Sequence, residues 1–170
     1  MLVFHLPISR SLVERGQSGV RECLAVARRG RRFADLTLVS DPVREPEDFP
    51  AAFAAIASQR PEAIFVLVDA LLGLHLGEII EFAANERLPS ASTFREFAAA
   101  GGLMSYGPNL AALQRQAADY VDRVFKGESP ATLPFQQPTT FELVINLKTA
   151  ETLGLTVPQL LLAQADDVIE

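Results

Sequence analysis

The sequence has very little cysteine, since Cys23 is the single one among 170 residues. This excludes a disulfide bond within the chain and a zinc site built from cysteines. Because Cys23 lies at helical spacing with Val20, Leu24 and Ala27, we interpret it as a small core residue. The chain also has no apolar run long enough to span a bilayer.

Basic residues are outnumbered by acidic ones, and the formal net charge is −6. This argues against nucleic acid as the main partner, because neutralising phosphates needs clustered Lys and Arg. The one basic cluster, at residues 28–32, is brief, and we interpret it as a solvated helix end. The first sixteen residues have neither a basic n-region nor a small-residue cleavage site, so we expect no export signal in this chain.

The sequence has none of the short motifs that mark common catalytic sites. It contains no G-x-S-x-G elbow, no phosphate-binding loop, no G-x-G-x-x-G and no paired His or Cys constellation. His75 has no second histidine near it to form a metal site, and a position near a helix start indicates a surface or capping role. We therefore expect a protein that is not an enzyme and that uses no cofactor or metal.

Apolar runs with strand-like and helix-like patterns alternate from residue 2 to residue 126. Residues 2–6 and 34–38 resemble strands, and residues 11–29 have a helical pattern. The continuous run at residues 63–68 is typical of a central parallel strand that is covered on both faces. This alternation predicts an α/β fold: a three-layer αβα lobe with a mostly parallel sheet and right-handed crossovers.

After residue 127 the composition changes. Residues 128–140 contain three prolines, which predicts an extended connector. Residues 141–145 alternate as a strand, and Asn146 is placed to cap a short helix. We thus divide the chain into an α/β lobe (1–127), a Pro-rich connector (128–140) and a C-terminal strand-helix appendage (141–170) that reaches away from the sheet.

Polar residues stand where three predicted strands end. Parallel α/β sheets collect ligands at the carboxyl ends of their strands. The sequence therefore predicts a ligand-binding site formed by Asp69, Ser92, Thr93, Ser105 and Tyr106.

Each of these residues also has a purely structural interpretation. Asp69 suits a ligand ammonium group, or it bonds its own backbone in a turn. Tyr106 either stacks on a ligand ring or straddles core and water. Ser92 and Thr93 donate to a carboxylate or cap the helix that begins near Phe94, and both roles are compatible because a helix N-terminus is itself an anion site.

Several longer stretches resemble a known family. They are residues 94–97 (FREF), 100–110 (AGGLMSYGPNL), 137–139 (QPT), 141–150 (FELVINLKTA), 153–158 (LGLTVP) and 165–170 (ADDVIE). Together they resemble the substrate-binding proteins of a bacterial ABC importer family associated with tryptophan, tyrosine and related solutes. The resemblance covers roughly residues 46–170, whereas residues 2–32 match poorly.

The resemblance implies a type I periplasmic-binding-protein fold, in which two lobes hold the solute in a cleft between them. This chain resembles the second lobe, followed by a segment (141–170) that in the family returns to the first lobe. Asp69 matches an acidic residue after the central strand, and Ser105 with Tyr106 falls on a strand-end motif. Ser92-Thr93 stands where the family often has Tyr-Gly, which removes an aromatic wall.

On this basis we expect one lobe of a non-catalytic solute-binding component that serves an ABC permease and takes a small amino-acid-like ligand. The resemblance implies a periplasmic or other extracytoplasmic location. One lobe alone should bind the solute weakly or not at all. The alternatives are a ligand-sensing regulatory domain of the same architecture and a truncated lobe that persists as a homo-oligomer through residues 141–170.

Overall fold

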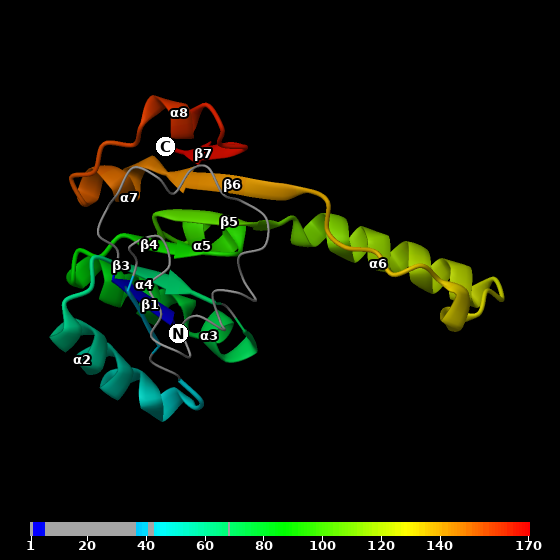
Figure 1. Ribbon diagram of the computed structural model, residues 1–170, viewed down its shortest axis with the longest axis horizontal. Helices are drawn as coiled ribbons and strands as arrows, with labels where there is room; N and C mark the ends of the chain where they lie inside the picture. Colours follow the sequence, from blue (N-terminus) through cyan, green and yellow to red (C-terminus); the bar gives the residue numbers. More distant parts are fainter. Residues whose placement is uncertain (1, 6–36, 41–42, 68) are drawn as a thin grey trace.

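A seven-stranded sheet forms the centre of the protein in the computed structural model, which describes residues 2–5, 37–40, 43–67 and 69–170 (Figure 1). The spatial order of the strands is β2-β1-β3-β4-β5-β6-β7. The predicted helix at 11–29, Cys23 and the basic cluster at 28–32 lie outside the described residues. The strands are β1 Leu2–His5, β2 Thr37–Ser40, β3 Ala63–Val66, β4 Ser90–Ser92, β5 Met104–Pro108, β6 Phe141–Asn146 and β7 Asp167–Ile169.

The sheet is mixed, with parallel pairing at its centre. The ladders β3–β4, β4–β5 and β6–β7 are parallel, whereas β1 runs antiparallel to both of its neighbours and β6 runs antiparallel to β5. The predicted α/β class and parallel central strands are confirmed. The strand predicted near residues 34–38 is β2, which lies at an edge of the sheet as expected.

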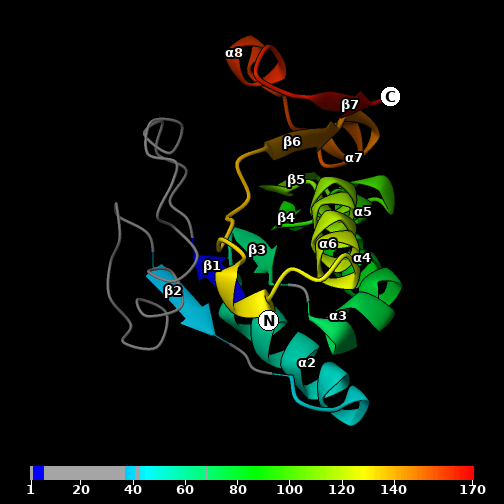
Figure 2. The same ribbon diagram turned by 90° about the vertical axis from the view of Figure 1, so that its right-hand side faces the viewer.

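Four helices pack against one face of the central strands. Figure 2 shows α3, α4 and α5 on the same side of β3, β4 and β5, with α2 below them. The helical segments are η2 Pro46–Asp48, α2 Phe49–Gln59, α3 Ala70–Leu74, α4 Leu76–Asn85, α5 Arg95–Ala99, α6 Leu110–Phe125, η3 Pro130–Thr132, α7 Leu147–Thr152 and α8 Gln159–Leu162.

The hydrophobic core lies between these helices and the sheet. Its members are buried and form one cluster from α2, β3, α3, α4 and α5. Phe49 belongs to it, and Phe53 and Phe82 pack against it with their ring centroids 4.4 Å apart. Burying such side chains contributes about 1.5–3 kcal/mol each. The cluster consists of Phe49, Ala52, Ile56, Ile64, Val66, Leu72, Ile79, Ala83, Leu88 and Phe97.

The two glycines that follow α5 allow its aromatic side chain to be buried. Gly101 has φ +116°, a left-handed conformation that ends the helix. A Cβ atom on Gly102 would lie 2.1 Å from the ring of Phe97, so a larger residue there would push this ring out of the core. The AGG sequence before β5 thus serves both the turn and the packing.

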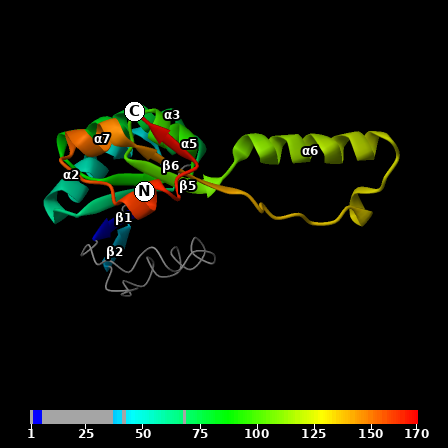
Figure 3. The same ribbon diagram turned by 90° about the horizontal axis from the view of Figure 1, so that it is seen from above.

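The long helix α6 leaves the body of the protein (Figure 3). None of its side chains is buried. Asn109 caps it, because the side-chain Oδ1 accepts a hydrogen bond from the N–H of Ala112 at 2.7 Å. Gly127, with φ +96°, ends it. The chain then returns to the sheet through the connector, and we call residues 109–140 the arm.

The C-terminal segment does not reach away from the sheet, so that prediction is wrong. β6 pairs with β5 from Met104 to Pro108, and β7 pairs with β6. Leu143, Val144 and Ile145 are buried, and this burial holds the segment against the sheet. The arm is the part that leaves instead. The division of the chain at residues 127 and 141 stays a prediction.

Replacing Phe97 by alanine should lower the free energy of unfolding by about 3–5 kcal/mol, because it removes a fully buried ring and leaves a cavity. Urea unfolding followed by circular dichroism measures this loss. The control is Leu160→Ala, at an exposed position in α8, which should change the free energy by less than about 0.5 kcal/mol. Equal losses in the two variants would contradict the assigned core.

Candidate functional site

The ends of the three parallel central strands lie along one edge of the sheet, which we call the carboxyl edge. Asp69 follows β3, Thr93 follows β4, and Tyr106 lies near the end of β5. The register aligns Val66, Ser92 and Ser105 in one row across the three strands. Asp69, Thr93 and Tyr106 therefore lie at this edge, Ser92 and Ser105 belong to the row just inside it, and the arm leaves the sheet from it (Figure 1).

Asp69 acts as the N-cap of α3. Its Oδ1 accepts a hydrogen bond from the N–H of Leu72 at 2.9 Å, which satisfies one of the free donors in the first turn. This is a local structural role, in which the carboxylate bonds to the backbone of its own turn. The side chain is exposed, so a carboxylate that performs this role also remains open to solvent.

Ser92 and Ser105 are buried beneath the helices rather than presented at the edge. Their row includes the core residue Val66, so both side chains point to the helix-covered face. The Oγ of Ser92 donates to the carbonyl oxygen of Val66 at 3.0 Å. The Oγ of Ser105 has no hydrogen-bond partner among the described residues. In this conformation neither hydroxyl is accessible to a solute.

Thr93 and Gly107 bring the ends of β4 and β5 into close contact. A Cβ atom on Gly107 would lie 1.8 Å from the carbonyl oxygen of Thr93, so this approach requires glycine. The alternative that Ser92 or Thr93 caps the next helix is wrong. The N-cap of α5 is Phe94, whose side chain makes no capping hydrogen bond.

Tyr106 points to the face opposite Ser105, because neighbouring residues of a strand alternate. Its side chain is half exposed, at 51%, and its ring stacks on that of Phe141 at a centroid distance of 5.9 Å. Phe141 starts β6 and is also exposed. The two rings form an uncovered aromatic surface at the carboxyl edge.

His75 lies at the junction of α3 and α4. Its Nδ1 is 2.9 Å from Oε1 of Glu78, and its ring contacts that of Phe49 with a centroid distance of 4.8 Å. It is thus held by structural contacts. Within residues 43–67 and 69–170, no three His, Cys, Asp or Glu side chains gather as metal ligands would. No helix in the described part of the chain has the length and apolar content of a membrane span.

A comparison with models of protein families identifies the family of this chain. The model of the family described as ABC transporter substrate binding protein matches residues 15–169. The chain belongs to this family. The resemblance stated from the sequence is therefore confirmed, and it extends further toward the N-terminus than the motifs indicate. Members of the family are typically extracytoplasmic and non-catalytic.

Three solved structures are similar to this chain in fold. A conserved domain protein from Vibrio cholerae is 27% identical with a TM-score of 0.75, and the match covers 86% of this chain and 47% of that one. The ABC domain from Streptococcus pneumoniae, solved in complex with L-Trp, is 25% identical with a TM-score of 0.70, covering 75% and 43%. The open structure of the substrate-binding protein CD0873 from Clostridium difficile, at 15% identity and a TM-score of 0.55, covering 77% and 43%, supports the fold alone.

The chain spans less than half the length of the solved structures that it matches. A search of curated proteins finds no match. The fold of this chain is thus that of the ABC transporter substrate binding protein family.

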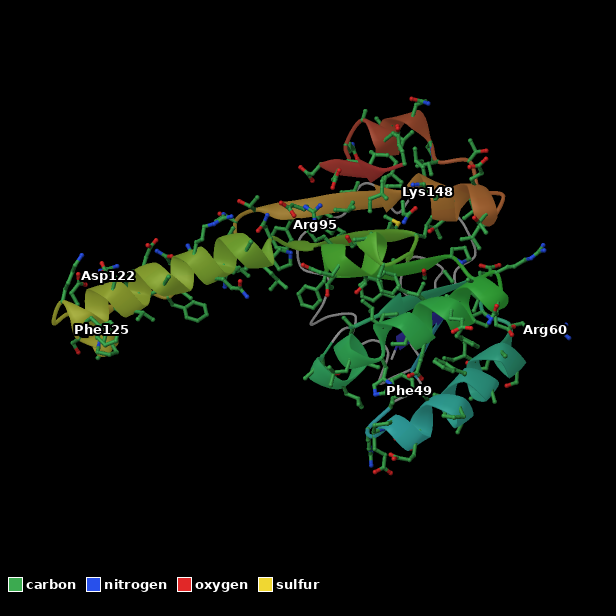
Figure 4. The ribbon with its side chains drawn as sticks, turned by 180° about the vertical axis from the view of Figure 1, so that it is seen from behind. Phe49, Arg60, Arg95, Asp122, Phe125 and Lys148 are labelled. Atoms are coloured by element: carbon green, nitrogen blue, oxygen red, sulfur yellow. The ribbon has the colours of Figure 1, made fainter. Side chains whose placement is uncertain are left out.

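Sequence reasoning missed a cluster of charged and polar residues beside the carboxyl edge. Arg95, the first residue of α5, lies 2.7 Å from Oδ2 of Asp167 and 3.9 Å from Oε2 of Glu142. Asn109 also donates to Glu142 through its Nδ2. Figure 4 shows Arg95 beside β6, near the start of α6. The position of Arg95 shortly after a strand end was the one sequence feature that pointed to this cluster. Its partners Glu142 and Asp167 could not be predicted, because they are distant in the sequence.

Two variants of Asp69 separate its capping role from its charge. Asp69→Asn keeps a capping oxygen and should change the free energy of unfolding by less than about 0.5 kcal/mol, whereas Asp69→Ala should lower it by about 1 kcal/mol. Urea unfolding of the two variants checks this. If both variants were equally destabilised, the loss would come from the charge and the capping role would be contradicted.

Ser92 and Ser105 form a matched pair, because they are register partners and both are buried. Ser92→Ala should lower the free energy of unfolding by about 1 kcal/mol, since it removes the hydrogen bond to Val66. Ser105→Ala should be neutral or slightly stabilising, since this hydroxyl has no partner in the described structure. Thermal and urea unfolding measure both. A larger loss at Ser105 would show that its hydroxyl makes a contact that the described residues do not provide.

Proposed function

We propose that this chain forms one wall of a solute-binding cleft in an ABC-type uptake system. Its family membership supports this proposal, and so does the state of its carboxyl edge. At that edge Asp69 and Arg95 are exposed at the starts of α3 and α5, and the paired rings of Tyr106 and Phe141 are exposed on the other face of the sheet. Large pockets bury most of a ligand between opposing walls. The carboxyl edge offers a carboxylate, a cation and aromatic rings to a ligand. The match to this chain covers less than half of each related structure, so the proposed opposing wall lies outside the matched part.

The proposed solute is a small amino-acid-like molecule. The carboxylate of Asp69 uses Oδ1 for capping, which leaves a second oxygen for an ammonium group. The rings of Tyr106 and Phe141 offer an apolar surface for the solute's side chain. In support, the related Streptococcus pneumoniae structure was solved in complex with L-Trp. In this proposal Ser92 and Ser105 support the carboxyl edge as buried residues and do not contact the solute.

Arg95 is the cation best placed to attract the carboxylate of such a solute. It is already paired with Asp167 and lies near Glu142, and these contacts limit its direct use. Because the pair is about half exposed, it is worth little energetically and can exchange partners at small cost. We therefore assign Arg95 to steering and Asp69 to direct contact.

The further parts of this proposal follow from the family. A substrate-binding component delivers its solute to a membrane permease, so an ABC permease is the proposed partner and the extracytoplasmic side is the proposed location. One wall cannot desolvate a solute fully, since affinity depends on closing the cleft. The isolated chain should therefore bind amino acids weakly, with a dissociation constant on the order of 1 mM or above.

Nuclear magnetic resonance titration of the isolated chain with L-Trp and other amino acids tests this function. The expected result is weak, saturable shift changes confined to residues of the carboxyl edge. Asp69→Asn should raise the dissociation constant about tenfold, because it keeps the cap and removes the charge that pairs with the ammonium group.

The matched control is Leu160→Ala, at an exposed position in α8 outside this edge, which should leave the titration unchanged. Tight, stoichiometric binding by the isolated chain would contradict the one-wall interpretation. Shift changes that avoid the carboxyl edge, or that are insensitive to Asp69→Asn, would contradict the proposed site.

A further inference from the structure

Four polar side chains join α5, β6, β7 and the base of the arm into one network, and the carboxylate of Glu142 lies at its centre. Its Oε1 accepts a hydrogen bond from Nδ2 of Asn109, and its Oε2 lies 3.9 Å from the guanidinium of Arg95. That guanidinium also lies 2.7 Å from Oδ2 of Asp167. The side chain of Glu142 is the least exposed of the three charged ones, at 21% against 49% for Arg95 and 46% for Asp167. One carboxylate therefore faces both the arm and Arg95.

The strand register explains why these charges meet. Glu142 is two residues before Val144, which pairs with the buried Ser105, so Glu142 points to the helix-covered face on which α5 lies. Asp167 pairs with Val144 in the next ladder and points to the same face. The partner of Glu142 in β5 is Gly107, so no side chain of that strand stands opposite the carboxylate.

Asn109 uses its backbone and both ends of its side chain at the base of the arm. Its N–H donates to the carbonyl oxygen of Thr140 at 3.4 Å, which closes the base just beyond the β5–β6 ladder. Its Oδ1 caps α6, and its Nδ2 donates to Glu142. The cap fixes α6 to Asn109, and the second bond fixes Asn109 to the sheet. The direction of α6 is thus linked to the carboxylate of Glu142.

We propose that Glu142 is a positioning residue that couples Arg95 at the carboxyl edge to the base of the arm. The positive charge of Arg95 keeps the carboxylate in the place where it accepts the hydrogen bond from Asn109. Without this charge the carboxylate turns toward solvent, and the bond from Asn109 weakens. Residues that share a partner in this way affect one another even without direct contact.

This coupling deepens the proposed function, and its use by a solute rests on that function. There Arg95 attracts the carboxylate of the solute. An arriving carboxylate competes with Glu142 and Asp167 for the same guanidinium, so it frees Glu142 and loosens the base of the arm. Occupation of the carboxyl edge is thereby passed to residues 109–140. Because such coupling is reciprocal, the state of the arm also affects the edge.

Amide hydrogen exchange of the full chain, measured without any solute, tests the coupling. The probe is the N–H of residue 109, because its hydrogen bond to Thr140 reports the closed base. Asn109→Asp keeps the cap, since Asp and Asn cap equally well, but it replaces the donor by a second carboxylate beside Glu142. The protection factor of this N–H, corrected for the intrinsic exchange rate, should fall about tenfold.

Exchanging the donor and the acceptor supplies a rescue. When Asn109→Asp is combined with Glu142→Gln, the introduced amide donates to the introduced carboxylate, and the protection factor should return to within about threefold of the wild type. Glu142→Gln alone keeps an acceptor oxygen for Asn109 and should stay within the same range. A residue that served only as a helix cap would give no loss in Asn109→Asp and no rescue.

Arg95→Gln tests the second contact of Glu142. It should lower the protection factor at residue 109 about threefold, and it should have no effect when Glu142→Gln is also present, because the route through the carboxylate is then removed. The matched control is Asp122→Asn, which breaks an exposed pair with Lys126 near the far end of α6 and should change nothing at residue 109. Circular dichroism verifies the folding of every variant.

Each of three results would overturn the proposal: wild-type protection in Asn109→Asp, no rescue in the swapped pair, or an effect of Arg95→Gln that is absent or that persists beside Glu142→Gln. These measurements contain no solute. Failure of the proposed function appears elsewhere, as a titration with L-Trp that leaves the carboxyl edge unchanged, so the two failures are distinguishable.

Discussion

The parallel register of β3, β4 and β5 is the constraint on which the rest of the structure depends. It places Val66, Ser92 and Ser105 in one row, and the core cluster covers that row from α2 to α5. Because side chains alternate along a strand, Tyr106 must then face the other side. The adjacent residues Ser105 and Tyr106 therefore have different surroundings: Ser105 is buried in the row, and the ring of Tyr106 is exposed.

The carboxyl edge is also where the chain leaves the sheet and returns to it. β5 leads into the arm at Asn109, and the arm leads back into β6 at Phe141. Hydrogen bonds from Asn109 hold these two points together. The proposed solute contacts consequently lie beside the point at which the arm leaves the sheet, where Tyr106 and Phe141 stack.

Local patterns predicted the elements well. The apolar run at 63–68 predicted β3, and the asparagine at 146 predicted the cap of α7, because a cap depends on residues only three positions apart. The direction of the C-terminal segment was predicted wrongly, since an alternating strand such as β6 does not show in its sequence which neighbour it will pair with. The cluster of Arg95, Glu142 and Asp167 was missed for the same reason.

The sequence by itself determined the α/β class, the family and the residues that stand at strand ends, because these follow from periodicity, local turn chemistry and long shared motifs. Only the tertiary structure decided that Ser92 and Ser105 are interior, that Asp69 caps α3 while remaining exposed, and that the arm rather than the tail leaves the sheet. The physical reason is that burial and strand partners arise from contacts between residues far apart in the chain, which no local pattern encodes.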